Sequence, residues 1–144
     1  MSATKHLETL AKICKKFGGT NNYQACARAV RPISAEEGRV RVEFEVTEDL
    51  TNPNKTLHGG CTATMIDIWT TAACLLTPRG FINTVSVSLN VDFLTAAKMG
   101  ETVVLDGRVL RMGRTKCYTE AELFRKSDMK MIAKGLHVKE ILSK

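Results

Sequence analysis

Hydrophobic and polar positions repeat along the chain with two different periods, and the change of period separates predicted helices from predicted strands. Near the start, apolar residues recur at helical spacing, and these are Leu7, Leu10, Cys14 and Phe17. Ser2 or Thr4 can cap this segment, and the glycine pair at 18–19 ends it. The pattern predicts a first helix, and residues 21–32 are compatible with a short helix followed by a strand.

The middle of the chain changes period and then becomes apolar almost throughout. From Arg39 to Val46, apolar and charged residues alternate, which predicts a half-buried strand. Residues 59–76 form a long apolar run that stops at Pro78 and Gly80. We therefore expect a long central helix there.

The last part of the chain is typical of strands joined by short turns. Residues 85–93 alternate strictly between apolar and polar, and three more strand-like runs follow at 102–111, 116–125 and 129–139. Short connections imply antiparallel neighbours, because parallel neighbours need a crossover of a dozen or more residues. The sequence predicts one α+β domain over residues 1–144, with an antiparallel sheet that has a helix on one face.

Composition narrows the function classes. The net charge is +6, but Lys and Arg are scattered and aromatics make up only 6% of the chain, so nucleic-acid binding is disfavoured. The apolar run at 61–76 is shorter than the roughly 20 residues that a bilayer needs, and it contains Asp67. No metal-ligand spacing is present, and the widely spaced cysteines indicate free thiols, namely Cys14, Cys26, Cys61, Cys74 and Cys117.

The N-terminal segment bears on the compartment. Residues 1–19 lack the continuous apolar stretch of a secretory signal. They are basic and amphipathic, which is also compatible with a mitochondrial presequence, but Glu8 and the regular apolar spacing favour a packed helix. We expect a cytoplasmic protein, with mitochondrial association as the alternative.

Asp67 is the only charged residue between Gly59 and Pro78. At 100° per residue it falls on a narrow strip of small or polar positions, with Gly60, Thr64 and Thr71. A carboxylate on an apolar helix is costly unless it is paired or hydrogen-bonded. Two interpretations stay open: a structural Asp satisfied by Thr64, Thr71 or the backbone, and a base or nucleophile.

The pair Gly59-Gly60 stands where the long helix begins. Helix N-termini offer unpaired N–H groups, and glycines let another group approach them closely, so this end could hold an oxyanion. The alternative is a tight turn. Gly60 and Asp67 lie seven residues apart, roughly 10 Å along the axis, so one reacting carbon cannot touch both within one chain. If both act on the same bond, they come from two subunits.

Two segments resemble a known family. Residues 52–67 read N-P-N-K-T-L-H-G-G-C-T-A-T-M-I-D, and residues 85–101 read V-S-V-S-L-N-V-D-F-L-T-A-A-K-M-G-E. They are similar to the hotdog-fold thioesterases related to phenylacetyl-CoA thioesterase, and within these to the acyl-coenzyme A thioesterase 13 (thioesterase superfamily member 2) type. The resemblance covers nearly the whole chain. It implies a hotdog fold, in which an antiparallel sheet wraps a long central helix, and a homodimer that pairs further into a dimer of dimers.

The resemblance also implies roles for five residues. Gly59 would donate its backbone N–H to the thioester carbonyl, and His58 would orient the site beside it. Asn52 would position the carbonyl or the water. Asp67 of the opposite subunit would act as general base or nucleophile, and Ser86 would hydrogen-bond the attacking water.

Each of these residues also has a simpler interpretation. His58 could only cap the helix, Asn52 beside Pro53 is by default a turn residue, and Ser86 lies on the polar side of its strand, where a solvated serine is usual. No G-x-S-x-G segment indicates a catalytic triad.

Coenzyme A carries phosphates that suit the basic charge balance. The candidates for binding them are Lys98, Arg111, Arg114 and Lys116, the last three around a predicted hairpin at Gly113. A solvated charged turn is the alternative.

The function predicted from these features is hydrolysis of fatty acyl-CoA of medium to long chain to free fatty acid and coenzyme A. No metal or cofactor is expected beyond the coenzyme A of the substrate. The alternative is a non-catalytic acyl-CoA or lipid-binding protein of the same fold. A hydratase or dehydratase, which hotdog folds also include, fits the residues less well.

Overall fold

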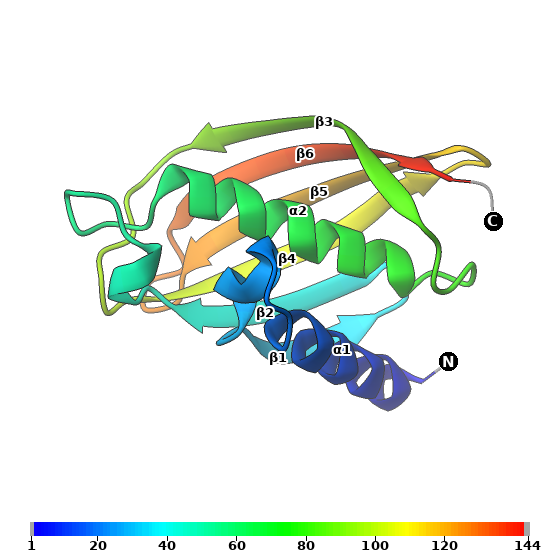
Figure 1. Ribbon diagram of the computed structural model, residues 1–144, viewed down its shortest axis with the longest axis horizontal. Helices are drawn as coiled ribbons and strands as arrows, with labels where there is room; N and C mark the ends of the chain where they lie inside the picture. Colours follow the sequence, from blue (N-terminus) through cyan, green and yellow to red (C-terminus); the bar gives the residue numbers. More distant parts are fainter. Residues whose placement is uncertain (1, 143–144) are drawn as a thin grey trace.

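A six-stranded antiparallel sheet wraps one side of a long helix in the computed structural model, which describes residues 2–142 (Figure 1). The strand order is β1-β2-β4-β5-β6-β3, so β1 and β3 form the two edges. The strands are β1 (Arg31–Glu36), β2 (Arg39–Glu45), β3 (Thr84–Phe93), β4 (Thr102–Met112), β5 (Lys116–Arg125) and β6 (Met131–Ile141). This confirms the predicted α+β class.

The N-terminal region matches the prediction except for one strand. Helix α1 (Ala3–Gly18) begins at Ser2, whose side chain accepts a hydrogen bond from the Lys5 N–H. A short 3₁₀ helix, η1 (Tyr23–Ala27), follows, and then β1. A second 3₁₀ helix, η2 (Glu48–Leu50), comes after β2. Most of β1 was not predicted, because its sequence R-P-I-S-A-E has no apolar alternation; as an edge strand it tolerates Pro32.

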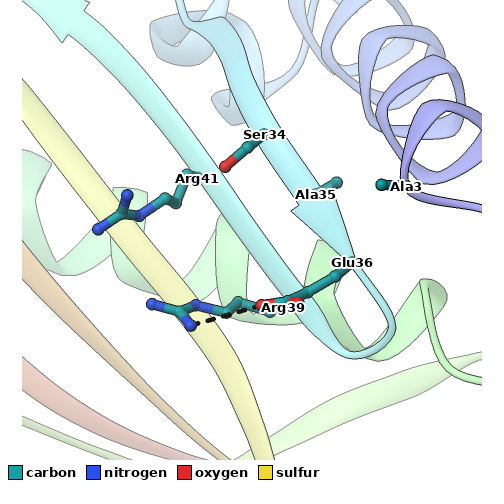
Figure 2. A pocket seen from close by; sticks show the side chains of 6 residues that line it. All are labelled: Ala3, Ser34, Ala35, Glu36, Arg39 and Arg41. Carbon is teal, nitrogen blue, oxygen red and sulfur yellow. Dashed lines mark hydrogen bonds and ion pairs between the residues drawn. The ribbon is translucent and has the colours of Figure 1, made fainter.

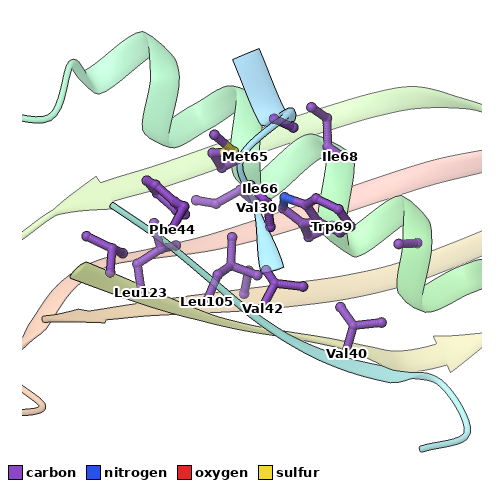
Figure 3. Close-up of a cluster of buried hydrophobic side chains, with 14 of the residues drawn as sticks. Val30, Val40, Val42, Phe44, Met65, Ile66, Ile68, Trp69, Leu105 and Leu123 are labelled. Atoms are coloured by element: carbon purple, nitrogen blue, oxygen red, sulfur yellow. The ribbon is translucent and has the colours of Figure 1, made fainter. Parts of the chain in front are cut away.

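Helix α2 (Gly59–Leu75) packs against the concave face of the sheet and supplies the centre of the core (Figure 3). Met65, Ile66 and Trp69 are fully buried against strand side chains such as Phe44 and Leu105. The helix approaches β6 very closely at Gly135, where an added Cβ would lie 2.9 Å from a methyl carbon of Ile66. A glycine at this position is therefore a packing requirement.

Strand β3 is much more exposed than its alternation predicts. It pairs only with β6, and its outer edge is open (Figure 1). Val85, Val87 and Phe93 are 48%, 54% and 60% exposed. These apolar side chains stay exposed in a single chain, because no element of the described residues covers this edge.

The remaining boundaries differ from the prediction by one or two residues. Strand β6 begins at Met131 rather than Met129, which has a left-handed φ of 57° and belongs to the turn before it. Among residues 2–142, no helix is long and apolar enough to cross a membrane.

Candidate functional site

The start of α2 presents one backbone donor to a cavity. His58 is the N-cap: its Nδ1 accepts a hydrogen bond of 2.8 Å from the Gly60 N–H, and its carbonyl accepts one from Thr62. The Gly59 N–H has no hydrogen-bond acceptor among residues 2–142. Gly59 lines a cavity of about 320 Å³ together with Asn52. The His58 cap thus leaves the N–H groups of Gly59 and Cys61 unpaired, and of these two residues only Gly59 lines this cavity.

Asn52 lines this cavity from a tight turn. Its Oδ1 accepts hydrogen bonds from the N–H groups of Asn54 and Thr56, and its Nδ2 donates to Thr56 Oγ1 over 2.8 Å. The turn interpretation of Asn52 is therefore correct. The same bonds fix the amide at the wall of the Gly59 cavity, where it could also contact a ligand.

Asp67 lies half-way along α2 and is not satisfied as a structural residue would be. The Thr64 hydroxyl donates to the Gly60 carbonyl and the Thr71 hydroxyl donates to the backbone carbonyl of Asp67 itself. Neither reaches the carboxylate, which is 49% exposed. Its nearest charged or titratable neighbours are His137, with Nε2 3.9 Å from Oδ1, and Lys139, with Nζ 4.0 Å from Oδ1.

His137 connects the helix to Ser86 through two hydrogen bonds. Thr70 Oγ1 donates to the Ile66 carbonyl over 2.7 Å, so its oxygen accepts from His137 Nδ1, also 2.7 Å away. With the proton on Nδ1, His137 Nε2 is an acceptor and Ser86 Oγ donates to it over 2.8 Å. The lone pairs of the Ser86 hydroxyl then remain free to accept a hydrogen bond from water.

The neutral state of His137 follows from its surroundings. Burial, and then the charge of Lys139, lower the pKa of His137 to about 4, although Asp67 acts in the opposite direction. The side chain is completely buried. The imidazole is therefore uncharged near pH 7, as the chain of hydrogen bonds requires.

A β-bulge brings Ser86 into this cluster. Ser86 is opposite Lys139 on β6, but Ser88 is opposite Val138, so Val87 is an extra residue in the ladder. Because one inserted residue switches the face of a strand, Ser86 points to the side of α2 while Ser88 points away. Ser86 is exposed to solvent, as the simpler interpretation expects, but the bulge puts it on the face of the strand opposite to that of Ser88.

Lys139 is a second group that sequence reasoning missed. It is 4% exposed, and its Nζ donates to Thr71 Oγ1 over 2.6 Å. Burial lowers the pKa of Lys139, and Asp67 is the first of the groups that oppose this effect. Asp67, Ser86, His137 and Lys139 thus form one polar cluster, which we call the Asp67 cluster.

The Asp67 cluster and the Gly59 cavity are separate within one chain. Neither Asp67 nor Ser86 is among the residues that line the Gly59 cavity. Seven residues of helix separate Gly60 from Asp67, which corresponds to roughly 10 Å. The predicted site residues therefore fall into two groups: Asn52, His58 and Gly59 at the helix start, and Asp67 and Ser86 half-way along it.

The four basic candidates are also divided. Lys98 is exposed, and its backbone forms an isolated antiparallel β-bridge with Thr56, beside the Gly59 cavity. Arg111, Arg114 and Lys116 belong to the β4–β5 hairpin, which contacts the other end of α2 through Thr77 and Met112. Lys116 is paired with Glu140. A single chain cannot bring Lys98 and this hairpin together on one phosphate group.

Another basic hollow, of about 260 Å³, lies on the outer face of β1 and β2 (Figure 2). Its arginines are already engaged: Arg39 donates to both carboxylate oxygens of Asp106, over 2.9 and 2.6 Å, and Arg41 donates to one of them over 3.2 Å. Because these arginines are already paired with Asp106, we interpret the hollow as part of the sheet surface and not as a phosphate site.

The five cysteines carry free thiols, as their wide spacing predicts. All five cysteines are free, and Cys74 and Cys117 are in buried contact with their sulfur atoms 2.9 Å apart. Within the described range, 2–142, no group of three His, Cys, Asp or Glu residues is placed to hold a metal ion.

Comparison with known proteins adds independent information. The model of a family described as the thioesterase superfamily matches residues 54–132. Human acyl-coenzyme A thioesterase 13 is 36% identical over 138 residues, covering 96% of this chain and 98% of that protein. The crystal structure of zebra fish thioesterase superfamily member 2 superposes with a TM-score of 0.91 at 35% identity, covering 94% of this chain and 98% of that chain. The mouse structure of the same name gives 0.86 at 32% identity, with coverages of 97% and 98%.

Proposed function

This chain belongs to the thioesterase superfamily and has the expected hotdog fold, and we propose that it hydrolyses fatty acyl-CoA of medium to long chain to fatty acid and coenzyme A. One observation carries the proposal. Gly59, whose N–H is unpaired, lines a cavity, and the same helix presents the carboxylate of Asp67, 3.9 Å from the His137 Nε2 that the Ser86 hydroxyl contacts. An oxyanion donor and a base are the two elements that thioester hydrolysis requires.

The proposed reaction runs through one tetrahedral intermediate. Water attacks the thioester carbon while Asp67 accepts a water proton and Ser86 orients the water. The carbonyl oxygen becomes an oxyanion that accepts a hydrogen bond from the Gly59 N–H. Asn52 lies beside this oxyanion. The carbonyl then re-forms and the C–S bond breaks, so that the coenzyme A thiolate leaves and takes the proton from Asp67. The alternative is attack by Asp67 itself, which gives an acyl anhydride that water hydrolyses.

Both groups can act on one bond if two chains associate through β3. The open edge of β3 offers unpaired backbone groups over ten residues, together with exposed Val85, Val87 and Phe93. Such an edge is a template for pairing with another strand. A two-fold axis between two β3 strands would set the helices side by side and turn the Gly59 end of one towards Asp67 of the other. A dimer of dimers stays a prediction from the resemblance.

The two ends of the substrate can be assigned from the cavities that flank the start of α2. A cavity of about 320 Å³ on the side of Gly60 is lined by Tyr23, Cys26, Leu50 and Cys61, which suit an acyl chain. The Gly59 cavity on the other side includes Asn52 and lies beside Lys98, which suits the polar coenzyme A arm and its phosphates.

Thiol release from a panel of acyl-CoAs tests the proposal. The native protein should release thiol with chains of medium to long length, and Asp67→Asn should be slower by roughly 100-fold or more. Asp128→Asn, which alters an exposed hairpin carboxylate, is the matched control and should keep native rates. Tight binding without release from any acyl-CoA would favour the non-catalytic alternative instead. Label found in the Asp67 carboxylate after a single turnover in ¹⁸O-water would establish the nucleophile, because water that opens the anhydride at Asp67 Cγ leaves its oxygen there.

A further inference from the structure

Lys139 is a buried cation that the proposed reaction does not use. It lies on β6, is 4% exposed, and has no ion-pair partner in the described residues except Asp67, whose Oδ1 is 4.0 Å from Nζ. A buried charge is costly, and replacing it by an apolar residue of similar volume is often neutral or stabilising. A lysine at this position therefore calls for an explanation other than stability.

Among residues 2–142, Asp67 is the only carboxylate paired with Lys139, and two thiols also face the ammonium. From α2 come Asp67, Thr71 and Cys74; from β5 comes Cys117; and from β3 and β6 come Ser86 and His137. His137 is neutral. The hydrogen bond to Cys117, together with burial, raises the pKa of Cys74, whereas the hydrogen bond from Cys74 and the charge of Lys139 lower the pKa of Cys117.

The hydrogen bond between Lys139 and Thr71 fixes the position of the ammonium. Thr71 Oγ1 donates to the backbone carbonyl of Asp67, one turn earlier on the same helix, and accepts from Lys139 Nζ. The ammonium is thus held behind the carboxylate, on the side away from solvent. The exposed half of the carboxylate remains open to water.

We propose that Lys139 is a positioning residue of the thioesterase site, which holds Asp67 as an oriented carboxylate through its charge and through Thr71. The inference rests on the proposed function of Asp67. Lys139 does not touch the reacting atoms. Its ammonium, 4.0 Å from Asp67 Oδ1, attracts the carboxylate that takes the proton from water and so holds its orientation.

The pH dependence has a definite sign. Burial lowers the pKa of Lys139 from its ordinary value of 10.5, so the ammonium loses its proton at a lower pH than a surface lysine does. As pH rises through that value, Asp67 loses its counter-charge and kcat should fall. Replacing Lys139 by Met should remove this alkaline limb.

The test compares Lys139→Met with Lys139→Arg and with Lys134→Met, an exposed lysine of the same strand. A positioned acid–base group contributes roughly 10²- to 10⁴-fold, so we expect removal of its support to lower kcat by about 10- to 100-fold. KM should change by less than about twofold, because the binding cavities are untouched. Lys139→Arg should restore part of the rate and the alkaline limb, while Lys134→Met should behave as native.

A merely structural lysine would give a different pattern. Lys139→Met would then lower the melting temperature while kcat and the pH profile of the folded protein stayed native, and this result would overturn the proposal. The proposal instead predicts a Lys139→Met protein that is at least as stable as native and slower.

An activity-independent measurement separates this inference from the proposed function. The Lys139 side chain, labelled with ¹³C at Cε, is titrated by NMR in the native protein and in Asp67→Asn. The midpoint should move to lower pH in Asp67→Asn, because the ammonium loses the charge that favours it. An unchanged midpoint would overturn the inference even if the native protein hydrolyses acyl-CoA. If no acyl-CoA is hydrolysed, the proposed function fails, and the titration still decides whether Lys139 and Asp67 are coupled.

Discussion

The Nε2 atom of His137 lies 2.8 Å from the Oγ atom of Ser86, and this contact fixes the direction of the serine hydroxyl. Because His137 Nδ1 donates to Thr70 and the buried ring is neutral near pH 7, Nε2 accepts and Ser86 donates to it. A serine that donates to the protein offers its lone pairs to water. The role that the resemblance implies for Ser86 therefore has a physical basis in a histidine that the family motif does not include.

Removing the Ser86 hydroxyl should slow the chemical step. We expect Ser86→Ala to lower kcat by roughly tenfold to 100-fold, because the attacking water loses one orienting partner. Ser88→Ala is the matched control: the bulge turns Ser88 to the opposite face, so its rate should stay native. Equal kinetic effects of the two changes, measured by thiol release, would contradict the assignment of faces.

Acid should destabilise the protein through His137. Its folded-state pKa of about 4 is below the unfolded value of 6.5, so the unfolded chain binds a proton that the folded chain does not. The stability from this group is complete above pH 6.5 and is lost as pH falls towards 4. Relative to His137→Gln, the native free energy of unfolding should fall by roughly 2 to 3 kcal/mol more between pH 7 and pH 4.5. Urea unfolding at both pH values measures the two free energies of unfolding. Equal losses in the native protein and in His137→Gln would show that His137 is not held neutral.

The close contact between α2 and β6 predicts a cost for a single methyl group. In Gly135→Ala the added Cβ would lie 2.9 and 3.1 Å from two carbons of the buried Ile66 side chain. Overpacking of this kind should lower the free energy of unfolding by about 1 to 3 kcal/mol. In Gly113→Ala the nearest atom is the Lys116 carbonyl oxygen at 3.7 Å, so this control should stay within about 0.5 kcal/mol of native. A Gly135→Ala protein as stable as the control would mean that the helix lies farther from the sheet.

Coenzyme A binding should depend on Lys98 more than on the β4–β5 hairpin if the phosphates lie beside the Gly59 cavity. Exposed charge pairs contribute about 0 to 1 kcal/mol, so Lys98→Gln should raise KM up to roughly fivefold at low ionic strength and less at high salt. The value of kcat should not change. A salt-sensitive rise in KM for Arg114→Gln, with none for Lys98→Gln, would instead assign the phosphates to the hairpin.

Much of the fold could be predicted because local pattern and tertiary packing agree. Helix α2 is apolar nearly all round and is enclosed as such, and β2 buries its alternating Val40, Val42 and Phe44. Strand β1 could not be predicted, since an edge strand needs neither alternation nor an unbroken row of N–H groups.

The site residues that sequence reasoning missed lie on β6, where alternation predicts the wrong face of the strand to be buried. On β6, Leu136 and Val138 are apolar and face outward, while His137 and Lys139 face the helix and are buried. A period-two pattern favours the reverse arrangement. One feature of the sequence did indicate polar residues on the inner face of β6. Asp67 is the single acid of an apolar helix, and such a carboxylate requires polar partners from a neighbouring strand.

The separation of Gly59 from Asp67 could be predicted from helical rise alone, and the two groups do lie apart in the chain. The bulge at Val87 could not, because a strictly alternating sequence contains no sign of it. Side-chain placement at the site thus depends on one irregular residue in an otherwise regular strand.

Complementation between two inactive variants tests most directly whether each site is built from two chains. Asp67→Asn retains an intact Asn52 and Gly59 end, and Asn52→Ala retains an intact Asp67 cluster. Each homodimer should be nearly inactive. If the two are unfolded and refolded together in equal amounts, about half of the dimers are mixed and each mixed dimer has one intact site, so thiol release should recover to about a quarter of the native rate. Recovery to that level is the result we predict, and a mixture no more active than its components would contradict a site shared between subunits.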